Sequence, residues 1–400
     1  MVATPGVLII DAQERSAAAA CRTLRAAGYR VGAACSSRPA PGQWSLACSK
    51  RYKLSDPRLG GRRYAEEAAA IADSDGYFTV MPGADASLLA VSRNRDVFGE
   101  GVDLSLPPVK VVETCVNKVD LLEAAASVGL DVPETIVCDT VADVRAAARE
   151  IGFPLLLKPR STVFQHDGKV REKASFLAPD AAALESRMSE FGFPCLLQRR
   201  EDGFPMSFAG VFAGGRLLGA VWSRYRRVWP PSAGSVSFSE SLDVPPALAE
   251  QIDGFLTAMG WQGIFELELI ERGPESYGAI DFNPRLYGSL ALAARAGVPL
   301  PAIWCDWLSG HQGEVRTARA GFHYRWEDAE LRNMIAHLRG RHLLAATSVI
   351  RPRRRCAHAF FAWNDPGPLL ARALELRMRY SAIRKGSDGT RMHRDRLVGS

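Results

Sequence analysis

The stretch that decides the fold is a pair of apolar runs joined by a turn. The first reads Gly263-Ile264-Phe265-Glu266-Leu267-Glu268-Leu269-Ile270, and after Gly273-Pro274 the second reads Tyr277-Gly278-Ala279-Ile280-Asp281-Phe282-Asn283-Pro284-Arg285. The two runs predict a β-hairpin, in which side chains alternate between two faces. Glu266 and Glu268 then share one face, and Asp281, Asn283 and Arg285 share one face of the partner strand.

If these two faces coincide, three carboxylates, one amide and one guanidinium converge on a small area. Three like charges raise one another's pKa unless a counter-ion is present. Oxygen ligands of this kind suit Mg²⁺, which proteins bind with one or two carboxylates plus substrate phosphates. The spacing alone leaves a second interpretation open, namely a solvent-facing polar hairpin.

The strand pair resembles the C-terminal signature of the ATP-grasp superfamily. Its motifs stand here as Leu267-Glu268-Leu269 and Ile280-Asp281-Phe282-Asn283-Pro284-Arg285. The resemblance implies that Glu268, Asp281 and Asn283 hold two Mg²⁺ ions, with Mn²⁺ as a substitute, on the phosphates of ATP. It also implies that Arg285 supports the transferred phosphoryl group as a catalytic residue. Glu268 is preferred to Glu266 because its spacing from Gly263 fits the family pattern better, and Asp281 replaces the more usual Glu.

Two lysines fit the same resemblance in a chain with 42 Arg and only 8 Lys. The stretch Asn117-Lys118-Val119-Asp120 resembles the start of the family's ATP-binding unit, and Phe153-Pro154-Leu155-Leu156-Leu157-Lys158-Pro159 matches its lysine-bearing strand. The resemblance implies that Lys118 and Lys158 neutralise the α- and β-phosphates, and Lys158 is counted with Arg285 as catalytic. The alternative for Lys158 is a surface lysine at a strand end.

Two other segments depart from the family pattern. The phosphate-covering loop, residues 161–168, has one glycine instead of several, so we expect the Ser161 hydroxyl to contact phosphate. The Asp167-Gly168 dipeptide in this loop predicts a hairpin turn. The strand that frames adenine reads Gln198-Arg199-Arg200-Glu201. Arg199 occupies the customary acid position, and we expect Gln198 and Glu201 to contact adenine and ribose.

A basic stretch, residues 223–231, resembles Arg-then-Pro-then-Gly stretches that lie near the acceptor pocket in carboxylate–amine ligases of this superfamily. Its Arg226 and Arg227 are the candidate substrate-binding residues, because a guanidinium matches carboxylates and phosphates with two hydrogen bonds. The alternative is an exposed basic loop without a ligand.

The predicted fold class is α/β and α+β. Residues 1–110 read as an N-terminal, Rossmann-like α/β pre-ATP-grasp domain that lacks a G-x-G-x-x-G fingerprint. Residues 111–310 are the ATP-grasp domain, with a nucleotide-clamping part to about 203 and a metal and substrate part from about 204. Residues 311–400 form a basic, partly helical extension, with 16 Lys/Arg against 7 Asp/Glu from Ala320 onward.

Composition narrows the class of protein. The 400 residues are 47% hydrophobic and 24% charged, which excludes disordered, collagen-like and coiled-coil chains. No apolar run reaches the length of a membrane span, and no signal peptide is recognisable. The eight cysteines are scattered, which indicates reduced thiols. We therefore expect a cytoplasmic protein. The net charge of +6 is interpreted as an arginine-rich solvated surface, with binding of an anionic partner as the alternative.

The resemblance to the ATP-grasp superfamily implies an ATP-dependent ligase that joins a carboxylate to an amine or thiol through an acylphosphate and releases ADP and phosphate. The expected partners are small-molecule carboxylate and amine substrates and a second copy of the chain, with no membrane and no nucleic acid. Three alternatives stay open: a kinase-like enzyme, an ATP-binding regulatory protein, and a modifier of anionic polymers that uses the Arg351–Arg355 cluster. The identity of the acid and of the amine is not encoded in these motifs.

Overall fold

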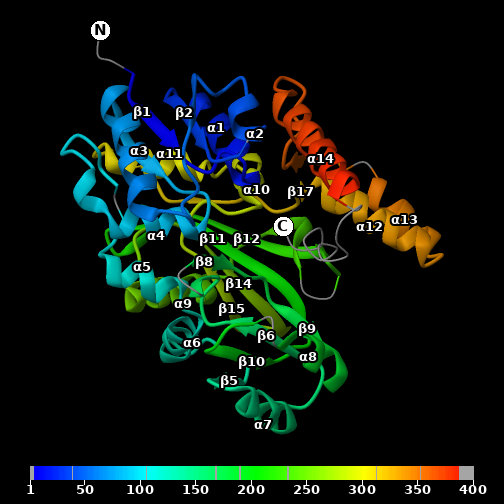
Figure 1. Cartoon of the computed structure of the whole chain (residues 1–400). Coiled ribbons are helices and arrows are strands. Elements are labelled where there is room, and N and C mark those ends of the chain that lie inside the picture. Colours follow the sequence, from blue (N-terminus) through cyan, green and yellow to red (C-terminus); the bar gives the residue numbers. More distant parts are fainter. Residues whose placement is uncertain are drawn as a thin grey trace.

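The computed structural model describes residues 4–37, 39–104, 106–166, 169–188, 191–231, 234–311, 313–351 and 353–386. Its elements form three layers of sheet, with helices covering the N-terminal sheet and one face of the largest sheet (Figure 1). None of the helices in these ranges combines the length and the apolar character needed to span a bilayer.

The N-terminal part is a parallel sheet in the order β3-β2-β1-β4. Its strands are β1 (Gly6–Ile9), β2 (Arg30–Cys35), β3 (Lys50–Lys53) and β4 (Tyr77–Met81). Its helices are α1 (Arg15–Ala26), α2 (Pro41–Trp44), α3 (Gly61–Ser74) and α4 (Asp85–Arg93), followed by the short η1 (Arg95–Val97). Every residue of β1 is buried, because helices cover both faces of a parallel sheet. The predicted N-terminal α/β arrangement is confirmed.

Two helices lead from this sheet to a small antiparallel one. They are α5 (Val109–Val116) and α6 (Lys118–Ser127), and Asn117 caps α6 by accepting a hydrogen bond from the Val119 amide. The small sheet, in the order β5-β10-β6-β9, contains β5 (Thr135–Cys138), β10 (Cys195–Arg199), β6 (Leu155–Pro159) and β9 (Phe176–Ala178). Helices α7 (Val141–Ile151) and α8 (Ala181–Met188) accompany it.

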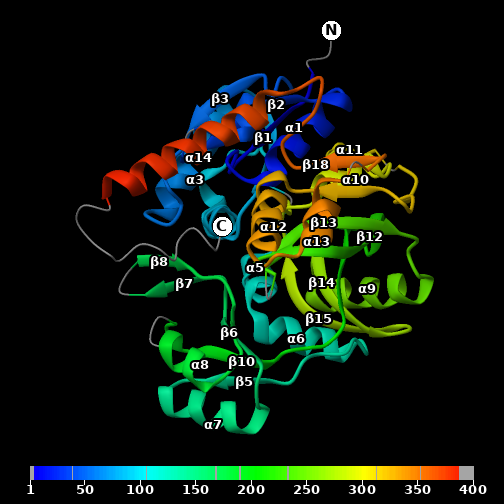
Figure 2. The same cartoon turned by 90° about the vertical axis from the view of Figure 1, so that its right-hand side faces the viewer.

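A separate hairpin, β7 (Val163–His166) and β8 (Lys169–Glu172), extends from the small sheet (Figure 2). The predicted turn at Asp167-Gly168 lies outside the described residues. The hairpin strands themselves pair antiparallel, with Val163 opposite Glu172.

The largest sheet carries the predicted hairpin at one edge. Its order is β15-β14-β11-β12-β13-β17-β18, and β16 pairs with β12 beside this path. The strands are β11 (Phe204–Ala213), β12 (Arg216–Trp229), β13 (Ser235–Leu242), β14 (Gly263–Gly273), β15 (Ser276–Asn283), β16 (Arg316–Thr317), β17 (His323–Arg325) and β18 (Cys356–His358). The predicted β14–β15 hairpin is confirmed, and helix α9 (Pro246–Met259) precedes it.

One prediction on this sheet is wrong. The exposed basic loop, which was the alternative for residues 223–231, is not what the structure shows, because β12 continues as far as Trp229; its partner β13 was not predicted. The register between them shifts on both sides of Arg227. These bulges interrupt the alternation of apolar and polar residues, which is the signal by which a strand is recognised in sequence.

Residues after 310 return to the body of the protein. Strands β16 to β18 pair within the largest sheet, and the helices after residue 310 are α12 (Glu327–Arg339), α13 (Leu343–Ile350) and α14 (Gly367–Gly386). Before residue 310, helices α10 (Leu290–Arg295) and α11 (Leu300–Leu308) follow the hairpin. Helix α14 packs against α2, and the Arg22 guanidinium donates to Asp365 at 2.7 Å. The predicted domain boundaries, including the one at residue 310, stay predictions.

Candidate functional site

The hairpin places its acidic side chains next to one another across two strands. Glu268 lies directly opposite Asp281, and Glu266 lies opposite Asn283. Side chains of residues directly opposite in an antiparallel pair start about 5 Å apart. The two strands therefore bring a Glu–Asp pair and a Glu–Asn pair onto one face of the sheet.

Two lysines from different elements reach the same place. Lys118 begins α6, and its buried Nζ forms an ion pair with Asp281, 163 residues away in sequence. Lys158 comes from β6 of the small sheet, and its Nζ donates to the backbone oxygen of Ile280 at 3.3 Å. Lys158 is 6% exposed, so the alternative of a surface lysine is wrong for this position.

The charges in this cluster perturb one another strongly. Burial, assisted by the neighbouring Lys118, lowers the pKa of Lys158 to about 8. Burial, together with the charges of Glu266 and Asp281, raises the pKa of Glu268 to about 8. Burial alone would raise the pKa of Asp281, but Lys118 and Lys158 outweigh it and hold that pKa below its usual range. Such opposed shifts are common where a protein binds or converts charged ligands.

Glu266 is held by hydrogen bonds, unlike its neighbour on the strand. Its Oε1 accepts from Ser207 Oγ at 3.0 Å, from Tyr225 Oη at 3.2 Å and from Ser289 Oγ at 3.2 Å. Its Oε2 accepts from Asn283 Nδ2 at 3.1 Å. For Glu268 one side-chain donor is described, Tyr225 Oη at 3.2 Å. Glu266 is thus a structural acceptor, which agrees with the preference for Glu268 as a ligand.

Three of these donors were missed in the sequence. Ser207, Tyr225 and Ser289 come from β11, from β12 and from the residue before α10. Tyr225 lies directly beside the two arginines singled out on β12, but a single polar residue within a strand carries no pattern of its own. The signal that could have found Tyr225 is its alternation with Arg226, which turns it to the face of the carboxylates.

Arg285 is engaged on two sides. Its Nε donates to Asp85 Oδ1 at 2.5 Å, and its Nη2 donates to Asn283 Oδ1 at 3.0 Å. Burial would lower the pKa of Arg285, but the Asp85 carboxylate outweighs it and raises that pKa further. The structure therefore places Arg285 beside a predicted metal ligand and against the N-terminal domain.

The predicted nucleotide residues lie on the small sheet or directly after its strands. Gln198 is buried on β10 and donates from Nε2 to Thr135 Oγ1 at 2.9 Å. Ser161 pairs with Asn117 in an isolated bridge, and its buried Oγ has no hydrogen-bond partner among the described residues. Glu201 instead accepts from Arg272 Nε at 2.6 Å. An unpaired buried hydroxyl is costly, so Ser161 remains a good candidate for a ligand contact.

Both predicted substrate arginines already have acidic partners. Arg226 is exposed and donates to Glu240 at 2.8 Å. Arg227 is mostly buried and donates from Nε to Glu330 of α12 at 3.0 Å, with its guanidinium carbon 4.4 Å from the Phe238 ring centroid. The structure does not bring either arginine into contact with the carboxylates of the hairpin.

The donor set of the hairpin suits a hard cation. Glu268, Asp281 and Asn283 provide only oxygen ligands, and two of them face each other across the strands. Within the described ranges no group of three or more His, Cys, Asp or Glu side chains is arranged to hold a metal by itself. The set therefore fits Mg²⁺ in a site that substrate phosphates complete, rather than an all-protein cage.

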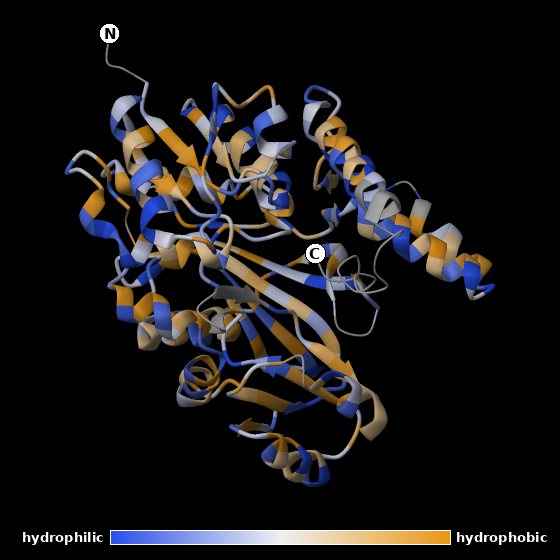
Figure 3. Ribbon diagram, in the orientation of Figure 1, coloured by the Kyte–Doolittle hydropathy of each residue, from blue (hydrophilic) through white to orange (hydrophobic). Residues whose placement is uncertain are grey.

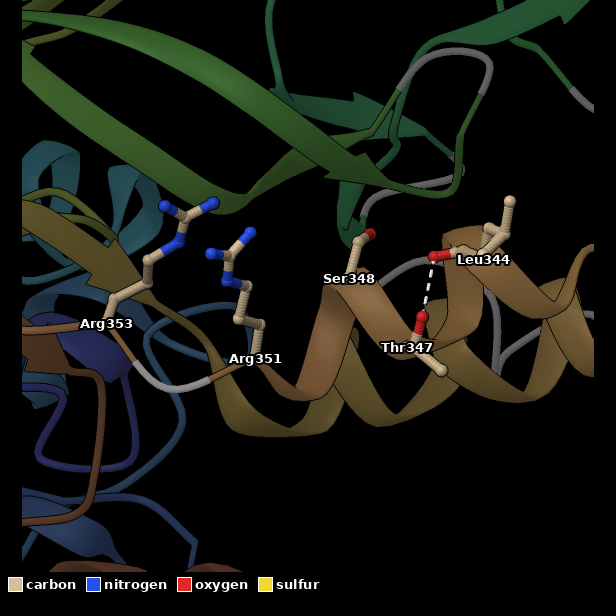
Figure 4. Close-up of a pocket in the computed structure, with 5 residues that line it drawn as sticks. All are labelled: Leu344, Thr347, Ser348, Arg351 and Arg353. Atoms are coloured by element: carbon tan, nitrogen blue, oxygen red, sulfur yellow. Dashed lines mark hydrogen bonds between the residues drawn. The ribbon is translucent and has the colours of Figure 1, made fainter.

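A second basic feature lies apart from this cluster. A surface hollow of about 420 Å³ is lined by Leu344, Thr347, Ser348, Arg351 and Arg353. Figure 4 shows the guanidinium groups of Arg351 and Arg353 side by side and pointing in the same direction. Within the described part of the chain, neither of these two arginines forms an ion pair, but both are exposed to solvent, which satisfies their charge.

Comparison with known proteins finds distant relatives in sequence and similar folds among solved structures. No model of a known protein family matches the chain. The large chain of carbamoyl phosphate synthase from Acidobacterium capsulatum is 27% identical over 164 residues, which cover 36% of this chain and 14% of that protein. The chain thus spans only about one seventh of the length of this relative.

Solved structures match over most of the chain. The ADP complex of N5-carboxyaminoimidazole ribonucleotide synthetase has a TM-score of 0.61 and 12% identity, covering 81% of this chain and 82% of that one. An L-amino acid ligase from Bacillus licheniformis has a TM-score of 0.58 and 15% identity, covering 76% and 74%. A biotin carboxylase domain from Hydrogenobacter thermophilus, in complex with MgADP, has a TM-score of 0.59 and 17% identity, covering 80% and 73%. These likenesses show that the chain has the ATP-grasp fold.

Proposed function

We propose that the protein is an ATP-dependent ligase that joins a carboxylate to an amine through an acylphosphate and releases ADP and phosphate. One observation carries the proposal: two buried lysines, Lys118 and Lys158, meet the Glu268–Asp281 pair between two sheets. The resemblance in fold to a synthetase solved with ADP and to an L-amino acid ligase supports the same class of reaction.

The lysines bind the phosphates of the nucleotide. Burial of Lys158 costs stability, as the lowered pKa of its ammonium group shows. An anionic phosphate reverses this cost, because charge-assisted hydrogen bonds in a dry site are about twice as strong as neutral ones. Lys118 gains a second anion beside Asp281, and the unpartnered Ser161 hydroxyl provides a further donor.

The acidic residues bind the cation. Glu268, Asp281 and Asn283 would hold Mg²⁺, with Mn²⁺ as a substitute, and the ion would neutralise charge on the phosphates. Glu268 must lose its proton first, and the hydrogen bond from Tyr225 and the charge of Lys118 favour that loss. Tyr225 holds one oxygen of Glu268 and so limits its rotation.

Of the two predicted substrate arginines on β12, one is assigned to the acceptor site. Arg226 is the better candidate for the carboxylate of a substrate, because its pair with Glu240 is exposed to solvent and exposed ion pairs contribute little. Arg227 pairs with the buried Glu330, so we assign it the role of holding α12 against the sheet. These two assignments are part of the proposal.

The test is a phosphate-release assay with Mg²⁺ and ATP across pools of carboxylic acids and amines, with mass spectrometry of the products. We expect slow hydrolysis of ATP alone and a strong increase when the right acid and amine are both present, with ADP as the nucleotide product. The variant Asn283→Ala serves as the inactive control. Release of AMP would overturn the proposal, and accumulation of a phosphorylated acid that no amine consumes would favour the kinase-like alternative.

A further inference from the structure

A continuous row of side-chain contacts leads from the N-terminal domain to the proposed metal ligands. Asp85 is the first residue of α4, and its carboxylate accepts from Arg285 Nε at 2.5 Å. Arg285 Nη2 donates to Asn283 Oδ1 at 3.0 Å, and Asn283 Nδ2 donates to Glu266 Oε2 at 3.1 Å. The row therefore joins residues that are 200 positions apart in the chain.

The two outer contacts of Asn283 determine how its amide is turned. A guanidinium can only donate, so it requires the oxygen of the amide, and a carboxylate that accepts requires the nitrogen. Arg285 on one side and Glu266 on the other therefore exclude the flipped amide. Because a carbonyl oxygen has two lone pairs, Oδ1 of Asn283 can accept from Arg285 and still bind a cation.

Arg285 depends on Asp85 for this role. The Arg285 side chain is 18% exposed and that of Asp85 is 9% exposed, so the pair is largely removed from water. The Asp85 carboxylate acts on Arg285 through both its charge and a hydrogen bond, and the charges of Glu14 and Glu266 act on it less strongly. A buried guanidinium that loses its counter-ion is strongly destabilised and tends to move toward water. The backbone oxygen of Leu286, which accepts from Nη1 at 3.0 Å, cannot replace that charge.

We propose that Asp85 is a positioning residue of the metal site. It holds Arg285, Arg285 holds the amide of Asn283 with its oxygen toward the cation, and metal affinity thereby depends on how α4 of the N-terminal domain is docked. The inference rests on the proposed function, since it assumes that Asn283 is a metal ligand.

The experiment compares Mn²⁺ binding, measured by electron paramagnetic resonance in the presence of ADP, between the full-length wild type and three variants. Asp85→Asn keeps the shape of the side chain and removes its charge. Arg285→Lys keeps the charge but cannot reach Asp85 and Asn283 together. Asp365→Asn is the matched control, because Asp365 is also a buried carboxylate that pairs with an arginine, Arg22, across distant parts of the chain.

We expect Asp85→Asn and Arg285→Lys each to weaken Mn²⁺ binding about tenfold or more, as loss of a residue that orients a ligand does elsewhere. Their effects should not add in the double variant, because both act through Asn283. Metal-free binding of ADP, measured by calorimetry, should stay within about twofold of the wild type, since the lysines are untouched. Asp365→Asn should lower the melting temperature without changing Mn²⁺ affinity.

Wild-type Mn²⁺ affinity in Asp85→Asn would overturn the inference and leave the proposed function standing. An equal loss in Asp365→Asn would also overturn it, because a general loss of stability would then explain both. If Asp85→Asn does not fold, Arg285→Lys decides the matter by the same measurement. A wild type that binds ADP but no Mn²⁺ would overturn both the inference and the proposed function.

Discussion

Replacing Lys158 by methionine should change stability and nucleotide affinity in opposite directions. Methionine fills a similar volume and carries no charge, so the packing between β6 and β15 is kept. The pKa of Lys158 is lowered from 10.5 to about 8, and at about 1.4 kcal/mol for each pKa unit this corresponds to a cost of about 3 kcal/mol for the charged form. The lysine is 6% exposed, so solvent screens little of this cost.

We therefore expect Lys158→Met to stabilise the nucleotide-free protein by about 1–3 kcal/mol at pH 7, with the calculated cost as the upper limit. For domains of 150–250 residues, each kcal/mol raises the melting temperature by about 2–4 °C. The same variant loses a charge-assisted contact worth about 1.5–3 kcal/mol, so ATP should bind about tenfold or more weakly. Opposite changes in stability and in affinity are expected for a residue that serves binding at a cost in stability.

The pH dependence provides an internal check. Because the folded-state pKa lies below the unfolded value, the cost is complete below pH 8 and disappears as the pH rises toward 10.5. The difference in melting temperature between wild type and variant should shrink over that window. Scanning calorimetry and titration calorimetry measure the two effects, with Lys50→Met, at an exposed pair with Asp75, as the control. A variant that is less stable than the wild type, or that binds ATP equally well, would refute the reasoning.

Three further predictions concern the carboxylates and the C-terminal part. Glu268→Gln should reduce Mg²⁺-dependent turnover about 100-fold or more. Glu266→Gln should reduce turnover only about tenfold, because it disturbs the amide of Asn283 without removing a metal ligand. Equal losses of initial rate in the two variants would contradict this assignment. The pKa of Glu268 is raised to about 8, so a metal must displace a proton from this carboxyl below that pH. Mn²⁺ affinity, followed by electron paramagnetic resonance, should therefore rise up to about tenfold per pH unit between pH 6 and 8 and then level off. A flat profile would show that this carboxylate is not a ligand. Deletion from residue 320 onward should cause unfolding or aggregation in size-exclusion chromatography, because it removes strands of the largest sheet and the partner of α2. A folded, active truncation that has lost only polyanion binding would reverse this view of the C-terminal part.

Features that depend on neighbouring residues in the chain could be predicted well. The alternation Glu266-Leu267-Glu268 places two carboxylates on one face of a strand, and β14 and β15 pair as that alternation requires. The apolar run before Lys158 predicts a buried strand, which β6 is. The N-terminal α/β order follows from equally local periodicity, and it too is confirmed.

The partners of these residues could not be predicted. Asp85 is an ordinary helix-starting acid in the sequence, and only the tertiary structure brings the start of α4 to Arg285, just after β15, and makes Asp85 its counter-ion. Arg226 and Arg227 appeared as a free basic loop, but they lie in β12 and pair with Glu240 and Glu330. Contacts of this kind join positions that are tens to hundreds of residues apart.

The physical reason is that local structure depends on interactions between neighbouring residues, whereas the site depends on interactions between distant ones. Side-chain alternation, caps and turns arise from steric limits on adjacent backbone dihedrals, so a short stretch of residues already encodes them and with them the hairpin and both lysine motifs. The ion pair of Lys118 with Asp281 and the raised pKa of Glu268 arise from desolvation and from charges brought close by the order of the strands. That order depends on how whole elements bury their apolar faces together, and it exists only once the tertiary structure has formed.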